Sequence, residues 1–381
     1  MSTQIHLFRP TYRIDECLAE IRECLEVGWT GIGFKTDQFE REFANYAGAN
    51  YCYFTNSSTS GIHLLFEVLK REKKWELDDE VITSPITFVS ANHAIAHAGL
   101  KPVFADVGIH LCLDADSVAQ QITPRTRAVM YVSLGGNAAE LIKIRGVCDK
   151  HGLTLIHDAA HSAGSRLNGA HLDKYADYSV YSFQAVKNLP TGDSGLIVLQ
   201  TEQELALAKQ LGWCGISKST FERARTGYVW DYSVSEAGWK YHGNSLTAAI
   251  ALVQLRYLES DNQRRREVVA QYLLQLTDIH HVRPIVHVNE DQSSRHLFQV
   301  FAPQRDALME FLRERDIGAG VHYRPNNQYP MYRYGKTPVA EKLWQDVVSL
   351  PLSLDMSDAD VTKICESISQ YYDTYDILKK C

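Results

Sequence analysis

The amino-acid sequence predicts an α/β protein: a mainly parallel sheet covered by helices on both faces, followed by a smaller C-terminal α+β part. From residue 37 to about 200, runs with helical spacing of apolar residues alternate with short apolar runs typical of buried strands. A long helical run from about 246 to 276 then precedes a tail of short strands and helices. We therefore expect a large domain at 12–250 and a small C-terminal domain at 251–381, with residues 1–11 packing nearby.

The individual elements follow from the spacing of apolar residues. An amphipathic helix is expected at 12–27, with Ile14, Leu18, Ile21 and Leu25 on one side. Further helices are expected near 37–46, 59–74, 88–98, 137–151, 202–211, 306–315 and 358–373. Strands are expected near 80–84, 101–105, 127–133, 153–157, 178–183, 195–199 and 296–301. Residues 213–243 are rich in Gly, Ser and aromatic residues without a clear period, and a loop of this length is often functional.

Composition excludes several classes of protein. The 381 residues are 45% hydrophobic and 22% charged, which is typical of a soluble globular chain. The net charge of −7 and the lack of a basic run argue against non-specific nucleic-acid binding. No apolar run reaches the ~18 residues of a membrane span, and the N-terminus lacks the apolar core of a signal peptide. The eight cysteines are scattered without a C-x-x-C pair, so we expect reduced thiols and a cytoplasmic protein.

The most informative stretch is YSVYSFQAVKNLPTGDSGLIVL, residues 178–199, which we interpret as strand, loop and strand with Lys187 on the loop. A lysine between two buried strands is partly desolvated, which favours the neutral, nucleophilic amine. Such lysines form Schiff bases with carbonyl compounds, among them pyridoxal phosphate (PLP). A solvated surface lysine is the commoner interpretation of any single lysine, so the other groups that PLP needs decide the question.

Three upstream stretches offer those groups. Asp158 follows the apolar run at 153–156 and could pair with the pyridine nitrogen, although an aspartate there could also cap a turn. The stretch TNSSTSG, residues 55–61, precedes a helical run and could bind the phosphate, although plain N-capping is the alternative. Phe88 follows a predicted strand and could stack on the ring, although a core aromatic residue is the alternative.

At this point the chain resembles a known family, the sugar-nucleotide aminotransferases of the DegT/StrS type within the fold-type-I PLP enzymes. The similar stretches run in the family's order along nearly the whole chain: GWTGIG and FEREFANYAGA (28–49), NSSTSGIHLL (56–65), DDEVITSPITFVSANHAI (78–95), KPVFADV (101–107), TPRTRAVMYVSLGG (123–136), HGLTLIHDAAHSAGS (151–165), YSFQAVKNLPTGDSG (181–195), GWKYHGNSLTAAIALVQLRYL (238–258) and VHYRP (321–325). The resemblance implies the aspartate aminotransferase-like fold of PLP-dependent transferases.

The resemblance also implies a role for each matching residue. Lys187 matches the lysine that binds PLP covalently, and Asp158 the carboxylate that pairs with the pyridine nitrogen. The remaining matches are His161 near the phenolic oxygen, Ser58, Thr59 and Ser182 at the phosphate, Phe88 on the ring, and His322 and Tyr323 facing the substrate. Asn244 matches an asparagine that reaches the phosphate of the neighbouring subunit, which implies a homodimer with shared active sites.

The sequence departs from the family's pattern at three positions. Ser133 in YVSLGG stands where the family usually has histidine. Ser58 stands where the phosphate loop commonly has glycine. His157 stands where glutamate usually precedes the carboxylate.

Metal chemistry is not expected. His93 and His97, and likewise His157 and His161, are four residues apart, but neither pair has the H-E-x-x-H glutamate or a cysteine at zinc spacing.

Two classes of function remain open on the sequence. The first is a PLP-dependent aminotransferase that uses glutamate, with pyridoxamine phosphate (PMP) formed in the half-reaction, to aminate a nucleotide-linked keto-deoxy sugar for a surface polysaccharide such as lipopolysaccharide O-antigen. The second is a PLP-dependent sugar dehydratase or a non-catalytic regulator on the same scaffold. The dehydratase that resembles this family has histidine at the position of Lys187, so the lysine favours transamination. The stretch GWKYHGNSLTAAIALVQL resembles enzymes that aminate C4 more than those that aminate C3. The sugar and the nucleotide (GDP, dTDP or UDP) stay open.

Overall fold

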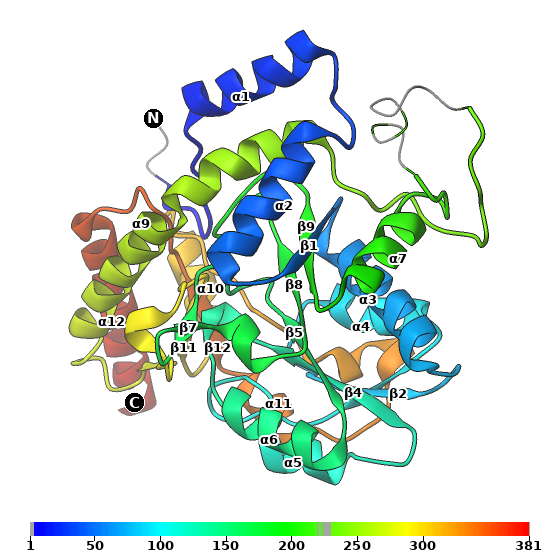
Figure 1. Ribbon diagram of the computed structural model, residues 1–381. Helices are drawn as coiled ribbons and strands as arrows, with labels where there is room; N and C mark the ends of the chain where they lie inside the picture. Colours follow the sequence, from blue (N-terminus) through cyan, green and yellow to red (C-terminus); the bar gives the residue numbers. More distant parts are fainter. Residues whose placement is uncertain (1–3, 219–220, 222, 224–229, 381) are drawn as a thin grey trace.

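The computed structural model describes residues 4–218, 221, 223 and 230–380, and a seven-stranded sheet lies at its centre (Figure 1). The strand order is β1-β9-β8-β5-β4-β2-β3. Strands β8, β5, β4, β2 and β3 are parallel to one another, whereas β9 runs antiparallel to both β8 and β1. Their bounds are β1 Tyr51–Thr55, β2 Glu80–Thr83, β3 Lys101–Phe104, β4 Thr126–Val132, β5 Thr154–Asp158, β8 Tyr178–Ser182 and β9 Gly195–Leu199. The predicted mainly parallel sheet is confirmed.

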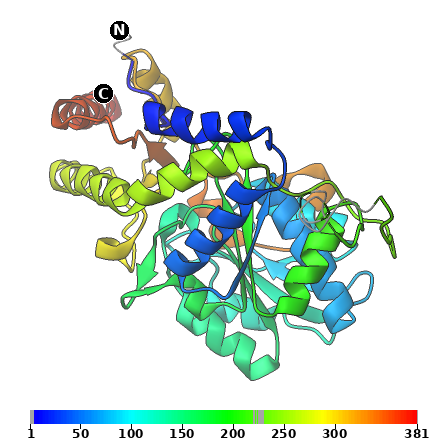
Figure 2. The same ribbon diagram turned by 45° about the horizontal axis from the view of Figure 1, so that its top comes forward.

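Helices cover both faces of this sheet (Figures 1 and 2). One face is covered by α3 (Ser58–Lys73), α4 (Val89–His97) and α7 (Glu202–Gly212). The other is covered by α2 (Phe34–Ala47), α5 (Ala115–Gln120), α6 (Leu141–His151) and the first half of α9 (Ser245–Gln275). Along β4, Met130 packs into the first layer and Tyr131 into the second. Because both faces are buried, the strands are continuous apolar runs in the sequence.

A smaller antiparallel sheet follows, built from β10 (Arg283–Pro284), β11 (Phe298–Phe301) and β12 (Val347–Leu350). It shares a core with the second half of α9, α10 (Arg305–Arg313) and α12 (Asp358–Lys380). The N-terminal segment joins this part, since the Ile5 N–H donates to the Asp316 carbonyl at 2.8 Å. The remaining elements are the hairpin β6 (Arg166–Leu167) and β7 (Ala170–His171), α11 (Pro338–Leu343), and the 3₁₀ turns Leu134–Gly136, Leu172–Tyr175, Glu290–Gln292, Asn326–Gln328 and Pro330–Tyr332. A domain boundary near residue 250, inside α9, stays a prediction.

Several expected elements differ from the structure in their bounds or burial, and three of them matter here. Helix α1 (Ile14–Val27) forms, but its apolar side is exposed and its buried residues are Cys17 and Cys24. The helix expected at 137–151 begins only at Leu141, because Glu140 has a φ of 64° and a helix cannot continue through a left-handed residue. The strand expected at 296–301 begins at Phe298. Among the helices described, none is long and apolar enough to cross a membrane.

Candidate active site

The candidate site lies beyond the carboxyl ends of β4, β5 and β8. Asp158 is the last residue of β5 and pairs in register with Val132 of β4 and Val180 of β8. Ser182 is the last residue of β8. Ligands of open α/β sheets bind outside the carboxyl ends of strands, so this edge is where a functional site is expected.

Lys187 lies in the loop between β8 and β9, in a turn closed by its N–H, which donates to the Gln184 carbonyl at 2.8 Å. Burial lowers the pKa of Lys187 to about 8, and the charge of Asp158 opposes this shift. A lysine with this pKa carries an appreciable fraction of neutral amine near neutral pH, which is the nucleophilic form.

The Asp158 carboxylate is 5% exposed and accepts the Ala160 N–H at 3.1 Å. Burial raises its pKa, and the Ala160 N–H, His157 and Lys187 each oppose that shift. A carboxylate has about four lone-pair positions, so the bond to Ala160 leaves capacity for a further donor such as a protonated ring nitrogen.

His161 presents a neutral donor to the same space. Its Nδ1 accepts the Gly135 N–H at 3.2 Å, so in the neutral ring the proton is on Nε2. Nε2 lies 3.4 Å from the Tyr323 hydroxyl. Burial holds the pKa of His161 well below its ordinary value, with smaller contributions from Lys187 and His322.

His322 and Tyr323 close one side of the site. Nδ1 of His322 is 2.8 Å from the Ser349 hydroxyl, and burial, aided by Lys187, lowers the pKa of His322 to about 4. The Tyr323 ring lies 6.0 Å, between centroids, from Phe88. Phe88 precedes α4 and is 58% exposed, so it presents an apolar ring beside Tyr323 rather than serving as a core residue.

The predicted phosphate residues come together at the start of α3. Ser58 and Thr59 are its first two residues, and Ser57 is the cap, accepting the Ser60 N–H at 3.1 Å. Gly195 pairs with Ser182, and a Cβ on Gly195 would come within 2.5 Å of the Ser58 nitrogen. This close approach places the end of β8 beside a helix N-terminus, whose free N–H groups and dipole favour an anion.

Asn244, predicted to reach a phosphate, lies at the start of α9. Its side chain caps α9 by accepting the Thr247 N–H at 2.9 Å. The preceding residues run antiparallel to β1, with His242 opposite Thr55 and the Gly243 N–H donating to Phe54. Each step from His242 to Asn244 therefore leads away from the start of α3. The predicted role of Asn244 in a neighbouring subunit stays a prediction.

The residue that contacts the lysine, His296, and the ring stacked on it were not predicted from the sequence. Nε2 of His296 is 3.4 Å from the Lys187 Nζ, and Phe8 stacks on the His296 ring at 5.6 Å with a 5° interplanar angle. A small cavity of about 10 Å³ beside them is lined by Arg265, whose pKa burial lowers to about 10. The only local indication of this contact was that His296 is the first residue of the strand expected at 296–301. A larger cavity of about 610 Å³, between α2, β1 and α7, contains none of the predicted site residues.

These residues fit PLP. Lys187 supplies an amine of low pKa, Asp158 an anion for the pyridine nitrogen, His161 a neutral donor, Phe88 an exposed apolar ring, and the start of α3 an anion site. His93, which lies outside this set, contacts a protein group, since its Nδ1 lies 2.7 Å from the Tyr332 hydroxyl. Within the described ranges, no group of three or more metal-ligating side chains is assembled.

A partly buried lysine and a buried carboxylate at the strand ends of this sheet are the arrangement expected of a PLP-dependent transferase of the aminotransferase fold. The chain belongs to the DegT/DnrJ/EryC1/StrS aminotransferase family, whose model matches residues 12–369. It is 32% identical over 368 residues to the spore coat polysaccharide biosynthesis protein SpsC of Bacillus subtilis (strain 168), covering 93% of each chain.

Solved structures of similar proteins have the same fold. Spr1654 from Streptococcus pneumoniae, in its PMP form, superposes with a TM-score of 0.90 at 25% identity, covering 99% of this chain and 100% of that one; a PLP form has also been solved. DesI, solved in the presence of its TDP-sugar product, gives a TM-score of 0.86 at 26% identity, covering 97% and 93%. The predicted family, fold and PLP cofactor are therefore confirmed, and the protein is a PLP-dependent sugar aminotransferase.

Proposed function

We propose that the enzyme transfers the amino group of glutamate to C4, rather than C3, of a nucleotide-linked keto-deoxy sugar, for amino-deoxy sugars of a surface polysaccharide or a glycosylated product. The observation that carries this proposal is the convergence of Lys187 and Asp158 in one buried site of a family member. The TDP-sugar of DesI supports a nucleotide-linked substrate, and the polysaccharide role of SpsC supports the pathway. The resemblance of residues 238–255 to C4 enzymes supports the position.

Each residue would have a separate task. When bound, PLP accepts the amino group of the donor and withdraws electrons from the reacting carbon into its ring. The Asp158 carboxylate would hold the pyridine nitrogen protonated, and the phosphate would lie at Ser58, Thr59 and Ser182. Nε2–H of His161 would donate to the ring's phenolic oxygen. Lys187 Nζ, free as an amine near its pKa of about 8, would remove and return the proton at the reacting carbon.

Substrate would enter beside His322 and Tyr323. His322 is neutral at physiological pH, because its pKa is about 4, so it offers hydrogen bonds without a charge. Burial raises the pKa of Tyr323, which therefore stays protonated and can donate to a sugar hydroxyl or keto oxygen. A retained Lys187 and Asp158 argue against the dehydratase and the non-catalytic regulator.

The enzyme would work as a homodimer with shared sites. The apolar side of α1 exposes Ile14, Leu18 and Leu25 by 56 to 67%, and such a patch is typical of an interface. Trp230 and Val234 are exposed on a loop that extends away from the sheet (Figure 1). A two-fold partner that buries these groups could receive Asn244 at its own phosphate site. The free thiols of the described cysteines support a cytoplasmic location.

A two-stage assay tests the proposal. The PLP-loaded protein is first given glutamate alone, and formation of 2-oxoglutarate with a change in visible absorbance is expected. Keto-deoxy sugars linked to GDP, dTDP or UDP are then added, and the aminated carbon of the product is located by NMR. If another amino donor reacts and glutamate does not, glutamate is not the donor. An amine at C3 of the product would show that the enzyme does not aminate C4. A deoxygenated product without nitrogen would favour the dehydratase.

A further inference from the structure

His296 is the one imidazole whose ring nitrogen contacts the Lys187 amine in the described part of the chain. Its Nε2 lies 3.4 Å from Nζ, and its side chain is 4% exposed. No role in the proposed transfer has been given to it above. A protonated lysine has only donors, so the lone pair of Nε2 is the matching acceptor.

The His296 ring is held from several sides. The Phe8 ring stacks on it with an interplanar angle of 5°, and the His161 ring lies 4.4 Å away between centroids. The backbone N–H of His296 donates to the Gly135 carbonyl at 3.0 Å, while the N–H of Gly135 donates to His161. The backbone of one residue, Gly135, therefore hydrogen-bonds to both histidine residues, through its C=O and its N–H.

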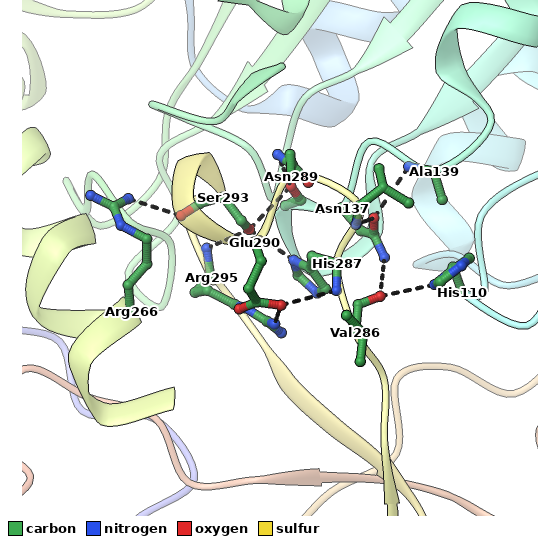
Figure 3. Close-up of polar contacts among 12 residues, drawn as sticks. His110, Asn137, Ala139, Arg266, Val286, His287, Asn289, Glu290, Ser293 and Arg295 are labelled. Atoms are coloured by element: carbon green, nitrogen blue, oxygen red, sulfur yellow. Dashed lines mark hydrogen bonds and ion pairs between the residues drawn. The ribbon is translucent and has the colours of Figure 1, made fainter. Parts of the chain in front are cut away.

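The segment that carries His296 is itself anchored, as Figure 3 shows. Arg295, fully buried, donates from Nε to Glu290 at 2.9 Å, and Nδ1 of His287 meets the Ser293 hydroxyl at 2.8 Å. Nη1 of Arg266 on α9 donates to the Ser293 carbonyl at 3.0 Å. These contacts hold residues 287–295 together and tie them to α9, so the backbone that carries His296 is held without a ligand.

We propose that His296 is a second catalytic residue: its neutral ring accepts a hydrogen bond from the Lys187 amine through Nε2 and aims the amine without placing a countercharge on it. A carboxylate at this position would also accept the bond. It would, however, stabilise the ammonium form and make the lysine a weaker nucleophile. A neutral imidazole accepts the hydrogen bond without stabilising the ammonium form of the lysine. Burial is the main reason why the pKa of His296 lies well below its ordinary value, and the charge of Lys187 is the next.

The charged and titratable surroundings are consistent with a neutral acceptor. Asp158, His161 and His322 also face Lys187, and only Asp158 is acidic. Around His296 the other groups are Lys187, His161, Arg265 and His322, each of which opposes protonation of the ring. The inference rests on the proposed role of Lys187 as the reacting amine.

The test measures the ionisation of Lys187 in the full-length protein without cofactor. The protein is labelled with trace acetic anhydride from pH 6 to pH 10, and the peptide that carries Lys187 is quantified by mass spectrometry. Wild type should be half-maximally reactive near the pKa of about 8. His296→Gln, which keeps a neutral acceptor, should stay within about twofold at pH 7, whereas His296→Glu should slow labelling by about tenfold or more.

His287→Gln is the matched control, because His287 lies in the same segment, is equally buried at 4%, and faces Arg295 and His110 instead of the lysine. Its Lys187 titration should match wild type, because glutamine can keep the hydrogen bond to the Ser293 hydroxyl and places no charge beside the lysine. An unchanged titration in folded His296→Glu would overturn the inference, and so would an equal shift in the control. If His296→Glu does not fold, the ¹H–¹⁵N spectrum of wild-type His296 decides: a proton on Nδ1 supports the acceptor role, and one on Nε2 overturns it. Borohydride trapping on a different lysine would refute the proposed function, while the labelling would still report the contact.

Discussion

The hydroxyl oxygen of Ser133 lies 2.8 Å from Nε2 of His157, and both side chains are fully buried. These are two of the positions at which the sequence departs from the pattern of the family. On the other side of the ring, Nδ1 of His157 faces Asp173 at 3.7 Å, and Asp173 accepts the Tyr181 hydroxyl at 2.5 Å. The two departures are thus parts of one polar chain beneath the site, next to Asp158.

We expect Ser133 and His157 to be energetically coupled. Ser133→Ala should lower the free energy of unfolding by about 0.5–1.5 kcal/mol, because it removes the shorter of two hydroxyl contacts of a buried imidazole nitrogen, the other being Ser162 at 3.3 Å. The double variant with His157→Gln should lose less than the sum of the single losses, with a coupling of about 0.5–3 kcal/mol in urea unfolding. Ser179→Ala is the control, since its hydroxyl is 3.5 Å from the same ring and forms a weaker contact. Additive losses would show that the contact carries no coupling.

The sheet was predictable from the sequence, whereas part of the site was not. Lys187, Asp158 and the start of α3 follow recognisable local patterns, because each depends on a strand end or a helix start. Phe8 and His296 are brought to the lysine by segments far apart in the chain, and neither carries a motif. The apolar spacing predicted helix α1 itself, but Ile14, Leu18 and Leu25 are exposed in the structure, because periodicity alone does not say what a helix face packs against.

Lys187→Ala is expected to abolish transamination and to leave PLP bound without a covalent link. The remaining contacts at Asp158, Phe88 and the start of α3 do not depend on the amine. Borohydride reduction of the wild type followed by peptide mapping should place the reduced adduct on Lys187, and the variant should release its cofactor on denaturation. A reduced adduct on another lysine would rule the assignment out.

The stability of the cofactor-free protein should depend on pH through Lys187. Its folded pKa of about 8 lies below the ordinary 10.5, so the protonated amine destabilises the folded protein. This penalty is absent at high pH and is complete once the pH has fallen below about 8. Lys187→Met removes this penalty. Its gain in unfolding free energy over wild type should therefore shrink by about 2 kcal/mol between pH 7 and pH 9.5. A gain that is constant across this range would mean that the buried amine does not titrate there.

Asp158→Asn should preserve the fold and reduce turnover strongly. The amide oxygen can still accept the Ala160 N–H, which is 3.1 Å from Oδ1, but it carries no charge to keep the pyridine nitrogen protonated. Circular dichroism and cofactor binding should match wild type, while kcat falls by about 10²-fold or more, as for loss of an electrostatic partner in a transition state. Turnover close to wild type in the purified variant would contradict the role.

The shared active site is tested by mixing two inactive variants. Asn244→Asp keeps the oxygen that caps α9, which accepts the Thr247 N–H at 2.9 Å, but replaces the amide donor by an anion that repels a phosphate. Mixed with Lys187→Ala, it should form dimers in which one site collects both changes and the other collects neither. Equal mixing makes half the dimers mixed, with one intact site of two, so activity should recover to about a quarter of wild type once subunits exchange. If Asn244 serves its own chain, every site in a mixed dimer carries one change, and no activity returns even though exchange is demonstrated by mass spectrometry of tagged subunits.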